Sequence, residues 1–138
     1  MAARADRRVL AAIFLGGFAG AIARALVGEA LVHDPGQWPW ATLLVNVAGA
    51  FVLGHVITRV EDGREHFTNA GRLLGTGFCG ALTTFSTLQL EVLQMLDAGH
   101  VAPAGAYLAV SVAAGLAAVA LATRITRRAG RPPRVAAP

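Results

Sequence analysis

Hydroxyl side chains are concentrated in one short segment, residues 75–87, and this segment holds the most suggestive chemistry of the chain. Four hydroxyl residues fall within five positions and follow three glycines: Gly75, Gly77, Gly80, Thr83, Thr84, Ser86 and Thr87. Glycine and threonine weaken a helix, and hydroxyl groups compete for its backbone hydrogen bonds, so the segment is predicted to interrupt a helix. Carbonyl groups freed there bind a hard cation such as Na⁺, whereas hydroxyl groups solvate an anion.

Two further polar residues lie inside apolar stretches, where a polar group costs free energy unless it is satisfied. Asn46 either makes a hydrogen bond between helices or faces an ion path. Arg24 has three open roles: it extends to the membrane surface, pairs with Glu29, or provides positive potential in a water-filled vestibule. His55 is expected to be neutral and structural, and Cys79 to pack as a small residue. Without a nucleophile–base pair or a metal-ligand cluster, the chain is predicted not to be an enzyme.

The elements that must hold these residues are predicted to cross a membrane. The 138-residue chain is 55% hydrophobic and 14% charged, whereas a soluble domain is about 25% charged. Four stretches carry no Asp, Glu, Lys or Arg: residues 9–23, 35–58, 73–90 and 98–123. Because a transmembrane helix needs roughly 20 mostly apolar residues, we predict spans at 9–32, 40–59, 73–96 and 102–124. The fold class is an all-α integral membrane protein with four transmembrane helices, the third broken mid-membrane.

Two other interpretations of the apolar stretches are disfavoured. A water-soluble bundle of this length would have to cover four such helices on every side. A cleaved signal peptide does not fit the first stretch, which is too long and contains Arg24. Small residues spaced four apart predict close helix packing within the spans. The pairs are Gly16 with Gly20, Ala50 with Gly54, and Ser111 with Gly115.

The charge pattern predicts the orientation in the membrane. All twelve basic residues are arginine, and eleven flank the spans on one side: Arg4, Arg7, Arg8, Arg59, Arg64, Arg72, Arg124, Arg127, Arg128, Arg131 and Arg134. The positive-inside rule places both termini in the cytoplasm, as for a multi-pass protein of the cell membrane. The chain then divides into a basic N-terminus (1–8), a four-helix domain (9–126) and a basic, disordered tail (127–138). This tail directly follows a span and lacks aromatic residues, so no nucleic-acid partner is expected.

The chain resembles the CrcB/Fluc family of fluoride channels, and the likeness covers roughly residues 9–126. It rests on residues 16–24 (GGFAGAIAR), 42–54 (TLLVNVAGAFVLG) and 77–80 (GFCG) running into 83–87 (TTFST). Tyr107 and Ser111 match a polar rail on the fourth helix of the family. The resemblance implies a passive, fluoride-selective channel that exports fluoride and lowers its toxicity.

The same resemblance implies an architecture and a set of site residues. Two four-helix subunits would pack antiparallel in the lipid membrane, with two fluoride pathways along their interface. A structural Na⁺ at the dimer axis would be held by the backbone carbonyls of Gly80 and Thr83. Arg24 would line a vestibule. The ion pathway would use Asn46, Phe85, Thr84 or Thr87, Tyr107 and Ser111.

This chain departs from the family pattern in two pore positions and in its charge bias. Leu88 stands where a second phenylalanine is usual, and Gly115 replaces a second serine of the rail. The eleven-to-none arginine bias predicts a single orientation, so an antiparallel mate would be a paralogous subunit of opposite bias. The alternatives are a small multidrug-resistance-type proton antiporter and a non-transporting membrane subunit. An antiporter needs an embedded carboxylate, but Glu29 and Glu91 are placed toward the ends of spans.

Overall fold

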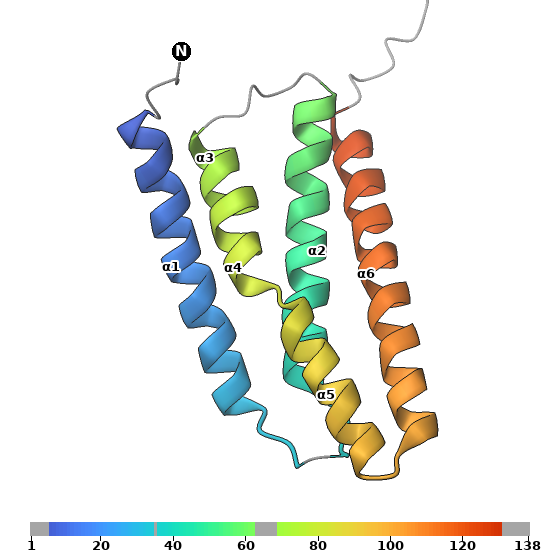
Figure 1. Cartoon of the computed structure of the whole chain (residues 1–138). Coiled ribbons are helices and arrows are strands. Elements are labelled where there is room, and N and C mark those ends of the chain that lie inside the picture. The colour runs from blue at the N-terminus through green and yellow to red at the C-terminus, as the bar shows by residue number, and fades with distance from the viewer. Residues whose placement is uncertain (1–5, 35, 63–68, 131–138) are drawn as a thin grey trace, which may run out of the picture.

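The structure is a computed structural model that describes residues 6–34, 36–62 and 69–130, and every regular element within those residues is a helix (Figure 1). The chain runs up and down along the long axis of the bundle, so that α1 and the succession α3 to α5 run in one direction, and α2 and α6 run in the other. The elements are α1 (Arg7–Ala30), α2 (Trp40–Glu61), α3 (Asn69–Gly71), the π-helix η1 (Arg72–Cys79), α4 (Gly80–Leu82), α5 (Phe85–Asp97) and α6 (Val101–Ala129).

Three of these helices, α1, α2 and α6, are long and apolar enough to cross a membrane. They correspond to the predicted spans 9–32, 40–59 and 102–124, which are thereby confirmed as apolar helices. The predicted span 73–96 is occupied by the succession η1, α4 and α5, and no single one of these elements has the length of a span. Helix α6 continues to Ala129, so the first residues of the predicted tail are helical, and residues 131–138 lie outside the described part.

Glycines bring two pairs of elements into close contact. A β-carbon on Gly16 or Gly20 of α1 would collide with the backbone carbonyls of Leu73 or Phe78. In α2, a β-carbon on Gly54 would come 3.1 Å from the α-carbon of a valine in α6. These contacts confirm the packing role predicted for the small residues of the first two spans. They also explain why α1 packs mainly on η1, and α2 on α6.

The third small-residue pair behaves differently within the subunit. Ser111 is buried, but a β-carbon on Gly115 would meet no described atom within 4 Å, so no other helix of the chain closely approaches the backbone there. Large apolar side chains are exposed around the bundle as well, including Phe14, Phe18, Phe85 and Leu116. An outward face of this kind is the surface that lipid or another membrane subunit covers.

Five of the buried side chains form a small cluster between α2, α5 and α6. Its members are Leu43, Leu88, Met95, Ala104 and Tyr107. Tyr107 is completely buried. The ring of Trp38 packs edge to face against its ring, with the two ring centroids 5.5 Å apart. The cluster lies in the half of the bundle that contains α5, so it fixes α5 against the two long helices that carry the remaining polar residues of the site.

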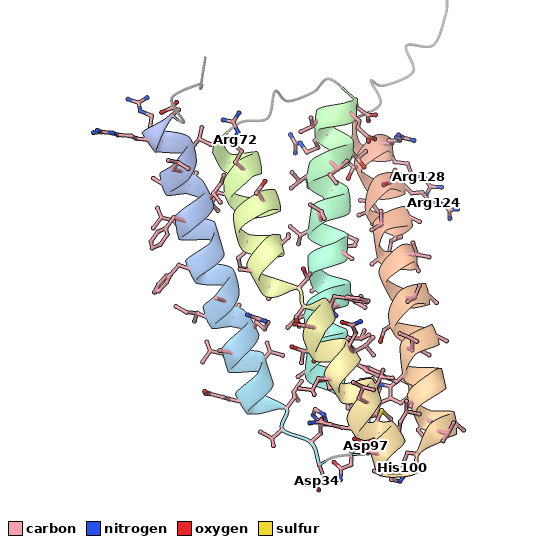
Figure 2. The ribbon with its side chains drawn as sticks, viewed as in Figure 1. Asp34, Arg72, Asp97, His100, Arg124 and Arg128 are labelled. Atoms are coloured by element: carbon pink, nitrogen blue, oxygen red, sulfur yellow. The ribbon has the colours of Figure 1, made fainter. Side chains whose placement is uncertain are left out.

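The two ends of the bundle differ in charge (Figure 2). Arg72, Arg124 and Arg128 lie at the end where α1 begins, and Asp34, Asp97 and His100 lie at the opposite end. We call these the arginine end and the acidic end. The arginine end carries the basic residues that the sequence assigns to one side of the membrane, apart from Arg4, Arg64, Arg131 and Arg134, which lie outside the described residues.

Candidate functional site

The polar centre of the bundle is formed where the helical path from α3 to α5 changes direction. Thr83 and Thr84 have extended backbones, with φ and ψ of −78° and 151° and of −148° and 122°. The hydroxyl of Thr83 donates to the carbonyl of Cys79 at 2.8 Å. The hydroxyl oxygen of Thr84 accepts the Thr87 N–H at 3.2 Å and so caps α5. Threonine side chains therefore satisfy backbone groups on both sides of the two extended residues.

Asn46 of α2 bonds to the extended residues through both the nitrogen and the oxygen of its side-chain amide. Its Nδ2 donates to the carbonyl of Thr84 at 3.0 Å, and its Oδ1 accepts the Thr84 N–H at 2.8 Å. The side chain thus pairs with the Thr84 backbone as a neighbouring strand would, and both backbone groups are satisfied. The amide nitrogen carries two hydrogens and uses one of them in this pairing, so its second N–H can donate to another group.

The carbonyls of Gly80 and Thr83 lose the donors that a continuous helix would supply. In an α-helix each carbonyl accepts the N–H four residues later. For Gly80 that donor is the Thr84 N–H, which instead bonds Asn46. For Thr83 it is the Thr87 N–H, which instead bonds the Thr84 hydroxyl. The chemistry of these two oxygens fits a hard monovalent cation, since such ions take carbonyl ligands.

A shallow depression of about 250 Å³ opens beside these groups and is lined by Asn46, Thr83, Thr84 and Phe85. The structure therefore brings together four of the residues that the sequence proposed for an ion path or a cation site. Phe85 is 70% exposed, so its ring lies on the outside of the subunit. A β-carbon on Gly80 would meet no described atom within 4 Å. Position 80 is therefore open within one subunit.

Glu91, which the sequence places toward the end of the third span, is directed into the interior of the bundle. Only 6% of its surface is exposed. The Thr42 hydroxyl donates to its Oε1 at 2.6 Å, and the Tyr107 hydroxyl donates to its Oε2 at 2.7 Å. Helices α2, α5 and α6 each contribute one member, so this carboxylate ties the three together.

Sequence reasoning assigned no role to Thr42 or Glu91, although their spacing contained a signal. Thr42 precedes Asn46 by four residues in α2, and Glu91 follows Thr87 by four residues in α5. Residues four apart share one face of a helix. Both therefore extend the polar line that begins at the extended residues.

A cavity of about 330 Å³ connects this polar line with α1. Its walls include Arg24, Thr42, Thr84, Thr87 and Glu91. Arg24 thus faces the same space as the hydroxyl groups, and among the described residues it forms no ion pair with Glu29. At this position the charge of Arg24 contributes positive potential to the polar cavity.

The remaining predicted site residues lie on α6. Ser111 follows Tyr107 by one helical turn and is buried, and its hydroxyl makes no hydrogen bond to the described residues. An unpaired hydroxyl at this position can donate to a ligand. Leu88 is buried in the core cluster and adds only apolar surface. Cys79 is 2% exposed, as expected for a packing residue.

The fold and the site together define a multi-pass helical membrane protein with a polar line through its interior. The chain matches the family described as CrcB-like protein, Camphor Resistance (CrcB), over residues 11–123, and it belongs to this family. It is 48% identical over 126 residues to the fluoride-specific ion channel FluC 1 of Mycolicibacterium paratuberculosis, which covers 91% of this chain and 96% of that protein.

Two further relatives extend the comparison. The fluoride-specific ion channel FluC 1 of Mycobacterium tuberculosis is 49% identical over 123 residues, covering 89% of this chain and 93% of the relative. The fluoride-specific ion channel FluC 2 of Nocardia farcinica is 40% identical over 122 residues, covering 88% and 87%. The likeness therefore includes all the helices that carry the site.

Proposed function

We propose that this protein is a fluoride channel that exports fluoride passively across the cytoplasmic membrane and so lowers its toxicity inside the cell. The observation that carries the proposal is the 48% identity to a relative named as a fluoride-specific ion channel, over an alignment that covers 91% of this chain and 96% of the relative. The line of hydrogen-bond donors inside an apolar bundle supports the same function, because fluoride is strongly hydrated and a pore must replace its water.

The donors available to fluoride divide into two kinds. The second N–H of Asn46 and the hydroxyl of Ser111 are left over from the bonds within the subunit, and either can donate to an anion. The hydroxyls of Thr42 and Tyr107 already donate to Glu91. A fluoride ion that uses them has to displace a bond to this carboxylate. The exposed ring of Phe85 adds a positive edge beside the depression.

We infer that two subunits pack antiparallel across the face that carries Phe85, with the extended residues near the middle of the membrane. The exposure of Phe85 and the open space beside Gly80 and Gly115 support an interface there. Na⁺ at this interface would be held by the carbonyls of Gly80 and Thr83 from both subunits. The ion would supply a fixed positive charge that offsets the desolvation of fluoride.

The mate is proposed to be a paralogous subunit of opposite orientation. The arginine bias favours insertion of this chain with both termini in the cytoplasm. Relatives bearing the numbers FluC 1 and FluC 2 agree with the existence of paralogous chains. Tags on the termini test the orientation: a single population with internal termini is expected. Equal populations in both orientations, with fluoride flux from this chain alone, would contradict an obligate partner.

The function is tested by fluoride efflux from liposomes that contain this chain, alone and with a paralogue of opposite charge bias. Efflux should be selective for fluoride over chloride and should run without a proton gradient. The absence of fluoride efflux from both preparations refutes the proposal. Efflux that stops when the proton gradient is removed would instead favour an antiporter using the buried carboxylate of Glu91.

A further inference from the structure

A second polar pocket lies between α2 and α6 at the arginine end, away from the polar line described above. It has a volume of about 180 Å³ and is lined by His55, Arg59, Thr126, Ala129 and Gly130. Its residues come from the last two turns of α2 and the last turn of α6, whereas the residues of the ion path lie on the opposite halves of these helices. None of the residues proposed for the ion path lines this pocket.

The hydrogen bonds around His55 determine which ring nitrogen is available to a ligand. The hydroxyl of Thr126 donates to the carbonyl of Ala122 at 2.7 Å. This hydroxyl has one hydrogen, so in its bond with His55, also 2.7 Å long, its oxygen accepts from Nδ1–H. In the neutral ring, Nε2 then carries a lone pair and accepts a hydrogen bond.

The walls of the pocket offer opposite kinds of groups. The guanidinium of Arg59 is a positive donor that matches a phosphate oxygen. Nε2 of His55 is an acceptor. Ala129 and Gly130 bring the end of α6, where the last carbonyls have no donor within the helix and that of Arg128 accepts the Gly130 N–H. The nearby Arg127 pairs with Asp62 at 3.5 Å. A ligand with a phosphate and with N–H donors complements both walls.

The position of the pocket matches the depth of lipid headgroups. Arg59 lies two residues before the end of α2, which corresponds to about 3 Å along the helix axis. Basic pockets between transmembrane helices on the cytoplasmic side bind the phosphate groups of lipid headgroups. Inorganic phosphate shares the anionic group but lacks the N–H donors and the acyl chains that would lie along the apolar helices.

We propose that the pocket between α2 and α6 binds a zwitterionic phospholipid headgroup that carries N–H donors, with its phosphate on Arg59 and its ammonium on Nε2 of His55 and the last carbonyls of α6. This inference does not depend on fluoride conduction. In this proposal, the arginine end of α2 and α6 binds a specific lipid, and its positive charges also orient the chain in the membrane.

The test compares two lipids that differ only in their headgroup donors. Phosphatidylethanolamine and phosphatidylcholine with the same acyl chains are added to the purified full-length protein, and bound lipid is counted by native mass spectrometry. Phosphatidylethanolamine should be retained about fivefold better, which corresponds to about 1 kcal/mol for one headgroup contact. Arg59→Gln should lower its retention by about the same factor. His55→Phe should abolish the preference for ethanolamine over choline.

Arg124→Gln is the matched control, because Arg124 lies at the same end of α6 but does not line the pocket. It should retain lipid as the wild type does. Arg59→Lys keeps the charge and should retain most of the lipid, so a loss in Arg59→Gln alone cannot be attributed to misfolding. Equal retention of the two lipids overturns the proposal. Thermal stabilisation by inorganic phosphate but by neither lipid also overturns it, because the ligand is then a free anion.

Discussion

The exchange of Asn46 for aspartate tests the central contact of the site, because it changes one atom of the amide and little of its shape. In Asn46→Asp, Oδ1 still accepts the Thr84 N–H, but the new oxygen takes the place of the nitrogen that donates to the Thr84 carbonyl. One hydrogen bond is lost and two oxygens face each other. Hydrogen bonds between membrane helices contribute about 0.6–1.7 kcal/mol, so we expect the free energy of unfolding to fall by about 1–2 kcal/mol.

The larger effect of this change is expected on conduction. The depression beside Asn46 is lined by the groups proposed to meet fluoride, so a carboxylate there confronts the anion directly. Two unit charges about 4 Å apart repel by about 4 kcal/mol at an effective dielectric constant of about 20. Because each ~1.4 kcal/mol changes a rate tenfold, fluoride flux should fall about a thousandfold.

The assay is fluoride efflux from liposomes, measured with a fluoride electrode, alongside size-exclusion chromatography of the purified variant. Gln94→Glu is the matched control, because it makes the same amide-to-carboxylate change at an exposed position of α5. This control should conduct as the wild type does. An Asn46→Asp protein that elutes normally and conducts at the wild-type rate refutes the placement of Asn46 in the pathway.

Four further substitutions probe the surroundings of the site. Gly49→Val should slow fluoride flux and lower the free energy of unfolding by about 1–3 kcal/mol, because a β-carbon there collides with the Thr83 side chain. Gly80→Val should abolish flux but leave the helix content measured by circular dichroism unchanged, since this position is open within the subunit; Thr83→Ser should be mild in both assays. Tyr107→Phe should cost about 1 kcal/mol in thermal unfolding and slow efflux, because Glu91 loses one of its two donors.

Each of these outcomes has a result that contradicts it. Gly105→Val controls for the helix propensity of valine, because a β-carbon at Gly105 also meets open space; a Gly49 variant no less stable than this control would exclude the collision. Wild-type flux in Gly80→Val would argue against a partner covering that face. Unchanged stability and flux in Tyr107→Phe would exclude a role for its bond to Glu91.

Hydropathy determined the long helices, because a charged side chain in hydrocarbon costs free energy that an uncharged stretch avoids. Helices α1, α2 and α6 coincide with three of the predicted spans to within a few residues at most ends. Local chemistry also singled out the segment of Thr83 and Thr84, since hydroxyl groups that compete for backbone partners act within a few residues of one another.

Only the tertiary structure decided which polar residues meet. Asn46 reaches Thr84 across 38 residues of sequence, and Glu91 accepts from Thr42 across 49. Helices α1 and α2 are apolar around most of their circumference, so their residue pattern does not indicate which face turns inward, as it does in a soluble amphipathic helix. Close packing of backbones at Gly16, Gly20 and Gly54 determines these faces instead. The tertiary structure also brings Glu91 onto two hydroxyl donors from other helices. These bonds replace the water that a buried carboxylate loses.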